Sequence, residues 1–271
     1  MDRSRARATI EQLGNGFPTG AWRGTSCAVK RLNLILDKGT AASFMAEVTM
    51  LTRVKHPRVV LFFGVSFDDR DHDCYLVTEY VARGNLQQML ASDEPLERNT
   101  KLQMCHDVAV GMDFLHQTDI IHRDLKSANV LVSDGFRLKI CDFGISRQVG
   151  MDAPTAMTGH IGTVPWTAPE VLSGEDSYDS KVDVFSYGIL LWEIVTRRMP
   201  YAGINSIKII NAVGKGLRPQ VPVPSDGDTY IAGLDTLMEQ CWSAASAQRP
   251  DFGAVSSRVG AILAAETAGA E

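Results

Sequence analysis

The sequence lacks a long uninterrupted apolar run. Its best candidate, Gly188 to Val195, is short and is broken by Glu193, whereas a helix that crosses a bilayer needs about 20 apolar residues. We therefore expect no membrane-spanning segment. The residues that follow Met1 do not contain the apolar core of a signal peptide either, so no secretory signal is predicted.

Cysteine is scarce, and the spacing of the cysteines does not suggest disulfide or metal-binding pairs. The five residues Cys27, Cys74, Cys105, Cys141 and Cys241 are scattered, odd in number and form no CxxC motif. This usage is typical of reduced thiols, and it predicts a cytoplasmic protein that can also be nuclear. The six histidines show no metal-ligand spacing.

An excess of positive charge is also missing. The chain has 27 basic and 32 acidic residues, a formal charge of −5, which argues against nucleic acid or an anionic membrane as a partner. With 271 residues, of which 45% are hydrophobic and 22% charged, the composition is that of a globular protein able to bury a sizeable core.

Two patterns of periodicity divide the chain. The first part alternates as strands do, with strands expected at 8–13, 26–32, 59–66 and 75–79 and one main helix at 40–54. The second part is helical, with helices expected at 86–91, 99–116, 180–196, 206–213, 231–242 and 252–265. The sequence predicts an α+β protein of one domain, 1–271. It has a small β-rich lobe at about 8–80, a hinge at about 79–84 and a larger, mainly helical lobe at about 85–265.

Three short clusters of residues carry the chemistry. They are Ile121-His122-Arg123-Asp124-Leu125-Lys126-Ser127-Ala128-Asn129, then Asp142-Phe143-Gly144, then Ala168-Pro169-Glu170. Each alone is short enough to arise by chance, but their order and spacing match the signature set of protein kinases. Ala28-Val29-Lys30 matches the lysine-bearing strand of the same set.

From about Ile10 to Val259 the chain resembles a eukaryotic protein-kinase domain. More narrowly it is similar to the tyrosine kinase-like group, which includes Raf and the mixed-lineage kinases. The similarity to this group is carried by His122 to Asn129, Asp142 to Arg147, Gly162 to Trp166, Cys241-Trp242 and Arg249-Pro250.

The resemblance implies roles for the polar residues of these motifs. Asp124 would accept the proton of the substrate hydroxyl, and Lys126 would contact the transferring γ-phosphate of ATP, as in serine/threonine kinases. Asn129 and Asp142 would hold Mg²⁺. Lys30 would hold the α- and β-phosphates and pair with a helix glutamate, and the candidate for that glutamate is Glu47.

The resemblance also implies an adenine site near the hinge. Thr78 would be the gatekeeper residue in front of it. The backbones of Glu79 and Val81 would bond the adenine, and Ala28 and Leu131 would enclose it from its two faces.

Further implied roles concern support of the catalytic loop. Thr163 would support Asp124 and shape the pocket for the residue after the phosphorylated one. Asp183 would brace the loop, and Glu170 would pair with Arg249. A buried stack would include Leu51, Phe62, His122 and Phe143.

Regulation by phosphorylation is implied as well. An arginine at the place of Arg123 receives a phosphate on the activation segment in this family. Thr155 and Thr158 are the candidate hydroxyls, modified by an upstream kinase or by the protein itself, with ordinary loop threonines as the alternative interpretation.

The glycine-rich loop departs from the family pattern. If Gly14 and Gly16 are its first two glycines, Thr19 stands at the place of the third and Ala21 at that of the valine. Pro18 has no N–H for a phosphate and is expected to resist pairing in a central ladder. Three explanations of this departure are open. A piece of the sequence has been lost, or the loop is short but works, or the domain is a pseudokinase that binds nucleotide poorly.

The function predicted from sequence is transfer of the ATP γ-phosphoryl group to serine or threonine hydroxyls of a protein substrate, with ATP and Mg²⁺ as cofactors. Tyrosine or dual specificity is one alternative, and a pseudokinase scaffold is another. A small-molecule kinase is disfavoured by Ala168-Pro169-Glu170 and Thr163, which serve a peptide substrate.

Overall fold

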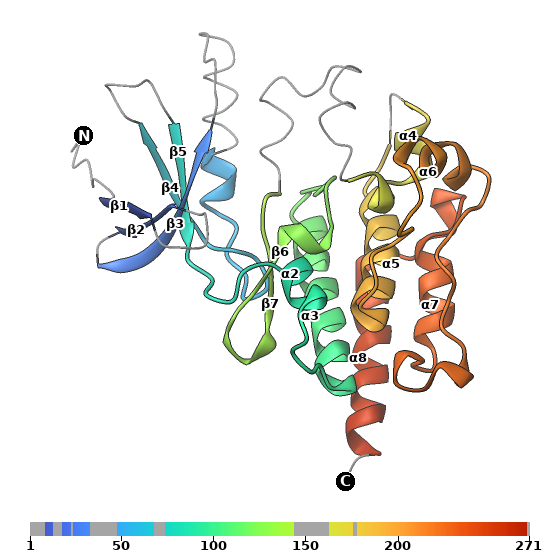
Figure 1. Ribbon diagram of the computed structural model, residues 1–271. Helices are drawn as coiled ribbons and strands as arrows, with labels where there is room; N and C mark the ends of the chain where they lie inside the picture. Colours follow the sequence, from blue (N-terminus) through green and yellow to red (C-terminus); the bar gives the residue numbers. More distant parts are fainter. Residues whose placement is uncertain are drawn as a thin grey trace.

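A five-stranded antiparallel sheet forms the first part of the molecule (Figure 1). The computed structural model describes residues 9–12, 18–22, 24–32, 48–67, 74–143, 163–175 and 178–269. The spatial order of the strands is β1-β2-β3-β5-β4. Their bounds are β1 Thr9–Gln12, β2 Pro18–Trp22, β3 Thr25–Leu32, β4 Phe62–Phe67 and β5 Cys74–Glu79.

Strand β3 shows how sequence alternation sets the two faces of this sheet. Cys27 and Val29 are buried and pack with Val77 of β5, whereas Lys30 is exposed. Because successive side chains of a strand point to opposite faces, Ala28 and Lys30 share the other face. The strand predicted at 26–32 is thus confirmed, and it carries Lys30 near its end.

Strand β2 was not predicted from the sequence. It lies between β1 and β3 and begins at Pro18, which pairs with Gln12. Pro18 has no partner on β3, where the register begins with Thr19 and Ala28, so it is paired on one side only and the expectation that it resists pairing in a central ladder holds on that side. Proline is tolerated here because it is the first residue of the strand, one of the positions to which the missing N–H confines it.

The remaining predictions for the sheet lobe are partly confirmed. Strand β4 begins at Phe62 and not at Val59, because Val59 instead forms a bridge with Ile140. Of the helix predicted at 40–54, the described part is helical at residues 48–51. Val48 and Leu51 are buried, as their helical spacing predicts.

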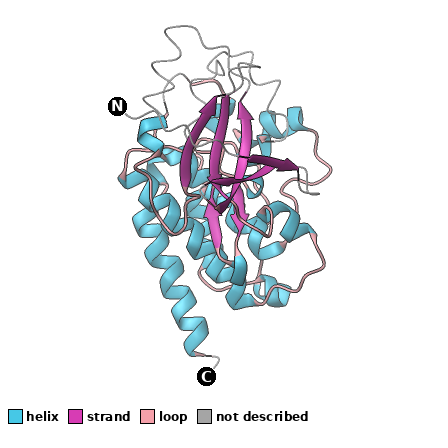
Figure 2. Cartoon of the chain, turned by 90° about the vertical axis from the view of Figure 1, so that its left-hand side faces the viewer, coloured by secondary structure: helices cyan, strands magenta, loops and turns pink. Residues whose placement is uncertain are grey.

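Helices form the second, larger part, and Figure 2 shows the sheet in front of them. The helices of more than one turn are α2 Leu86–Ala91, α3 Arg98–Gln117, α5 Lys181–Thr196, α6 Ser206–Val213, α7 Leu234–Cys241 and α8 Phe252–Ala268. Shorter elements are α4 Pro169–Leu172, the hairpin of β6 Val130–Val132 with β7 Leu138–Ile140, and 3₁₀ turns at Ser127–Asn129, Asp134–Phe136, Val164–Trp166, Pro224–Thr229 and Ser246–Gln248. The predicted α+β architecture with a small sheet and a larger helical part is confirmed.

Helix α5 is the core of the helical part. All its residues from Val182 to Val195 are buried, including Asp183 and Glu193. Its sequence is apolar on every side, which is typical of a helix enclosed by other elements. Helices α3 and α7 pack against it, and α8 lies along α3 (Figure 1).

Two helix boundaries differ from the sequence prediction by three residues, whereas the other boundaries agree with it to within one residue. Helix α7 begins at Leu234 and not at Ile231, because Gly233 precedes it with φ of 86°, a left-handed conformation that a helix cannot include. Helix α8 continues beyond the predicted end to Ala268. In the parts of the chain that the structure describes, no helix is long and apolar enough to cross a bilayer.

Gly111 on α3 lies directly against Ile140 of β7 and the backbone of Arg58. A Cβ built there would lie 2.7 Å from Ile140 Cδ1 and 2.9 Å from the carbonyl oxygen of Arg58. We predict that Gly111→Ala destabilises the protein by about 1–3 kcal/mol, although alanine in an open helix is favoured over glycine by about 1 kcal/mol. The free energy of unfolding in urea measures this.

Gly214 provides the control for that substitution. It ends α6 with φ of −62°, and a Cβ there meets nothing within 4 Å. Gly214→Ala should leave the stability unchanged or raise it slightly. If both variants keep the wild-type unfolding midpoint, α3 and β7 are not as tightly apposed as described.

Candidate active site

The loop between α3 and β6 is shaped by one buried carboxylate. Asp183, fully buried in the first turn of α5, accepts hydrogen bonds from the backbone N–H groups of His122 at 2.8 Å and Arg123 at 2.7 Å. His116 Nε2 lies 2.8 Å from the same carboxylate. Arg123 has a φ of 66°, which is costly for a residue with a side chain. The bonds to Asp183 hold the backbone in that conformation, so the predicted brace is confirmed.

The loop brings four of the predicted catalytic side chains together. Lys126 Nζ lies 2.8 Å from Asp124 Oδ2 and donates to Thr163 Oγ1 at 2.7 Å. Asn129 Nδ2 donates to the Asp124 carboxylate and to its main-chain oxygen, each at 2.8 Å. Asp124 thus faces two donors that fix the direction of its carboxylate, and one of these donors also binds Thr163 from the later segment.

Asp142 lies beside this group and contacts the sheet lobe. Lys30 Nζ is 2.8 Å from Asp142 Oδ2, and the side chains are 54% and 38% exposed. The N–H of Cys141 donates to the main-chain oxygen of Asn129 at 3.0 Å. This bond brings the backbone before Asp142 against that of Asn129, the other residue predicted to bind metal.

His122 connects the two motifs through its ring. Its Nε2 donates to the main-chain oxygen of Cys141 at 3.0 Å, and its Nδ1 accepts from the N–H of Asp124 at 3.3 Å. His122 is buried, as are Leu51, Phe62 and Phe143, the other members of the predicted stack.

The predicted adenine residues come from β3 and β5 of the large sheet, from the hinge, and from β6 of the separate two-stranded sheet. Ala28 of β3 is paired with Thr78 of β5, and Leu131 lies on β6. The N–H of Glu79 is bonded to the main-chain oxygen of Leu61 at 2.9 Å, so that group already has a partner. Val81 follows in the hinge and is largely buried.

The side chain of Glu79 has a role that sequence reasoning missed. Both of its carboxylate oxygens lie 2.7 Å from Lys139 Nζ on β7, and one accepts from the N–H of Leu61 at 2.7 Å. The Glu79–Lys139 ion pair thereby links the hinge to β7, the strand that precedes Asp142. Lys139 alternates with buried Leu138 and Ile140, so its sequence pattern predicts only an outward-facing lysine.

Some predicted residues fall outside the part of the chain that the structure describes. These are Gly14, Gly16 and Glu47 of the predicted ATP site, and Thr155 and Thr158 of the predicted phosphorylation segment. The predicted Lys30–Glu47 ion pair therefore stays a prediction. Arg123 itself is described, and its buried Nε has no hydrogen-bond partner among the described residues.

The Glu170–Arg249 pair is confirmed. Arg249 is 2% exposed, and its two terminal nitrogens donate to the two carboxylate oxygens of Glu170 at 2.6 and 2.8 Å. This bidentate geometry satisfies both charges away from water. It joins α4, which follows the Thr163 segment, to the segment between the 3₁₀ turn Ser246–Gln248 and α8.

Glu193 is a second buried carboxylate near the site. It is 3% exposed and accepts from Ser127 Oγ at 2.7 Å and from Trp166 Nε1 at 3.1 Å. Burial raises the pKa of Glu193 to about 7, and the two hydrogen bonds offset part of that rise. The sequence marked it only as the charge that interrupts an apolar run.

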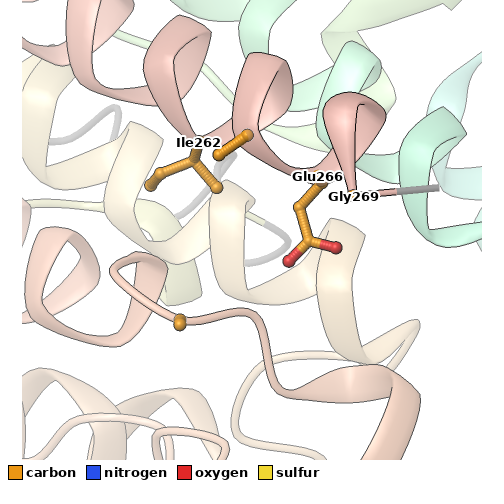
Figure 3. Close-up of a pocket in the computed structure, with 5 residues that line it drawn as sticks. Ile262, Glu266 and Gly269 are labelled. Carbon is orange, nitrogen blue, oxygen red and sulfur yellow. The ribbon is translucent and has the colours of Figure 1, made fainter. Parts of the chain in front are cut away.

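A hollow lies beside the last turns of α8 (Figure 3). It is lined by Ala232, Ile262, Ala265, Glu266 and Gly269, around the last turns of α8. Its carboxylate, Glu266, is already paired with Arg98 in a bidentate contact at 2.9 and 3.0 Å. None of these lining residues belongs to the catalytic motifs.

Comparison with known proteins agrees with the geometry. Residues 10–259 match the family described as protein tyrosine and serine/threonine kinase. The chain therefore belongs to the protein tyrosine and serine/threonine kinase family, which confirms the resemblance drawn from the motifs.

Named relatives from two organisms are similar over most of this chain. The serine/threonine-protein kinase CTR1 of Arabidopsis thaliana is 35% identical over 90% of this chain. Serine/threonine-protein kinase 12 of the same plant is 35% identical over 89%. The probable serine/threonine-protein kinase drkD of Dictyostelium discoideum is 39% identical over 86%. The matched part makes up 30%, 53% and 18% of these three relatives, respectively.

The pKa of Glu193 leads to a prediction about stability and pH. Its ordinary value is 4.5 and its value in the folded protein is about 7, so the folded chain keeps a proton that the unfolded chain releases. This contribution to stability is complete below pH 4.5 and is lost as the pH rises through 7. Glu193→Gln has no such proton, so its free energy of unfolding should fall less over this range than that of the wild type.

Urea denaturation of both proteins at several pH values measures the difference. The two curves of stability against pH should converge at the acid end and separate toward neutral pH, with the variant the more stable there. Parallel curves across the whole range would contradict the raised pKa.

Proposed function

We propose that the chain is a serine/threonine protein kinase domain that uses Mg²⁺ and ATP. The observation that carries the proposal is the position of Lys126 Nζ, which bonds both the Asp124 carboxylate and the Thr163 hydroxyl. Phosphoryl transfer depends on positioning and charge neutralisation, and this arrangement supplies both at one point. The names of the relatives support the choice of serine and threonine over tyrosine.

Asp124 is the proposed proton acceptor. The bonds from Lys126 and Asn129 orient its carboxylate, which leaves the substrate hydroxyl to approach it from the open side of the site. Lys126 would lie beside the transferred phosphoryl group and offset its negative charge. Thr163 would fix Lys126 and shape the pocket for the next substrate residue.

Asn129 and Asp142 are the proposed metal ligands. Asn129 uses its amide nitrogen toward Asp124, so its amide oxygen is available to a cation. Carboxylate and amide oxygens are the donors that Mg²⁺ takes in phosphoryl-transfer sites, so the residues fit this ion. When bound, the ion would neutralise phosphate charge and orient the phosphates.

The ATP site would extend from these residues to the hinge. Lys30 would hold the α- and β-phosphates, with Gly14 and Gly16 above them and Glu47 as its ion-pair partner.

The adenine would lie nearer the hinge. Ala28 and Leu131 would enclose it, and Thr78 would be the gatekeeper. The backbones of Glu79 and Val81 would bond the adenine. The pairing of Ala28 on β3 with Thr78 on β5 supports this adenine site, because it places the predicted enclosing residue beside the strand that leads into the hinge.

Regulation and location are part of the same proposal. An upstream kinase or the protein itself would phosphorylate Thr155 or Thr158, and Arg123 would receive the phosphate. The unbonded Nε of Arg123 supports this role. The buried thiols of Cys74, Cys105 and Cys241, which form no disulfide among the described residues, support a cytoplasmic location that can extend to the nucleus.

A pseudokinase scaffold is the second candidate. The observation that favours it is the place of Thr19, which is paired with Ala28 inside β2 although the family pattern has a loop glycine there. A β-branched strand residue restricts the backbone where a glycine would let it approach a phosphate. The complete set of Lys30, Asp124, Asn129 and Asp142 favours the active enzyme.

The test is phosphate transfer from γ-labelled ATP to a generic basic protein, with Asp124→Asn as the variant. We expect activity in the wild type and a loss of about 10²- to 10⁴-fold in the variant, the range that a general base contributes. Asp119→Asn is the matched control, because Asp119 is an exposed carboxylate in the same loop. It should keep full activity.

Phosphoamino-acid analysis of the product separates serine and threonine from tyrosine. Phosphotyrosine as the main product would overturn the proposed specificity and leave the dual-specificity or tyrosine alternative. Absence of any transfer, together with no thermal shift on adding Mg²⁺ and ATP, would instead favour the scaffold.

A further inference from the structure

Two segments of the active site meet a single buried side chain on α5. Ser127 opens the 3₁₀ turn Ser127–Asn129, and Trp166 closes the 3₁₀ turn Val164–Trp166. Both are almost fully buried. Each donates one hydrogen bond to a different oxygen of Glu193, at 2.7 and 3.1 Å.

The neighbours of these two residues carry the chemistry. Lys126 directly precedes Ser127, and the N–H of Asn129 bonds back to the Lys126 oxygen at 2.9 Å. On the other side, the N–H of Trp166 bonds to the oxygen of Thr163 at 3.0 Å. The Lys126–Thr163 contact is therefore one link between the two segments, and Ser127–Glu193–Trp166 is a second link that runs beneath it.

We propose that Glu193 is a positioning residue that couples the catalytic loop to the substrate-binding segment and so keeps Lys126 in register with Thr163. This inference rests on the proposed kinase function. A carboxylate is suited to this place because it offers two acceptor oxygens to two donors that approach from different segments. An apolar side chain of similar size would leave the Ser127 and Trp166 donors without partners in a buried region.

A direct role toward substrate is the alternative for a carboxylate near this site. Glu193 is 3% exposed and both of its oxygens already accept hydrogen bonds. It therefore does not present a free charge to a basic peptide residue. Its raised pKa of about 7 agrees with enclosure away from water.

Ser127→Ala and Trp166→Phe each remove one donor, and Glu193→Leu removes both acceptors. We expect each single-donor variant to lower kcat/KM for a peptide substrate about tenfold, the factor typical of one lost hydrogen bond to a charged group. The KM for ATP should stay within about twofold, because hinge and phosphate contacts do not pass through Glu193. Glu193→Gln should recover most of the activity, since its oxygen accepts from Trp166 and its amide donates to Ser127 Oγ.

Tyr187→Phe is the matched control on the same helix. Its hydroxyl is fully buried and donates to the Cys105 oxygen on α3 at 3.1 Å, away from both active-site segments. This variant also loses one buried hydrogen bond of α5, so it should be destabilised while keeping wild-type kcat and KM. A purely structural role for Glu193 would make Ser127→Ala and Trp166→Phe behave like Tyr187→Phe, and that result would overturn the inference.

Amide hydrogen exchange provides a readout that needs no kinase activity. Ser127→Ala should speed exchange at residues 164–167, and Trp166→Phe should speed it at residues 127–129, by about tenfold for a link of this kind. Tyr187→Phe should change neither segment. An inactive wild type would overturn the proposed function alone, whereas absence of this reciprocal exchange effect would overturn the coupling through Glu193.

Discussion

The active site depends on carboxylates buried in α5, which accept hydrogen bonds from the catalytic loop. Asp183 holds the N–H groups of His122 and Arg123, and without those bonds the left-handed backbone at Arg123 would relax. A buried carboxylate is costly unless its lone pairs are used, so the loop and the helix stabilise each other only when they are correctly assembled. The helix that forms the hydrophobic core therefore also sets the position of Asp124.

This arrangement explains why the reactive groups can remain partly exposed while their supports are buried. Asp183 and Glu193 have little contact with water, and both are saturated by donors from the loops above them. Asp124 and Lys126 are 23% and 17% exposed and keep faces open to a substrate. Geometry is thus fixed by bonds inside the protein, and the groups proposed to do the chemistry need not be enclosed to be well placed.

Much of the site could be predicted from the sequence, because its motifs fix residue types at set spacings. Asp124, Asn129 and Thr163 converge as expected, and so does the Glu170–Arg249 pair. Pairings that depend on distant segments could not be predicted. Strand β2 has a composition of low strand propensity and exists because β1 and β3 flank it. Glu193 interrupts an apolar run, and nothing local shows which loops reach it.

The Lys30–Asp142 contact differs in kind from these buried bonds. Its side chains are 54% and 38% exposed, and a solvent-exposed ion pair is worth about 0–1 kcal/mol. Asp142 does not depend on it, because β7 is held by backbone bonds between Ile140 and residues 58–60 and by the Lys139–Glu79 pair. The pair can therefore open at little cost, and each partner can exchange the other for a ligand. This weak pairing is compatible with the proposed roles of Lys30 toward phosphate oxygens and of Asp142 toward a cation, because neither side chain is committed to the other.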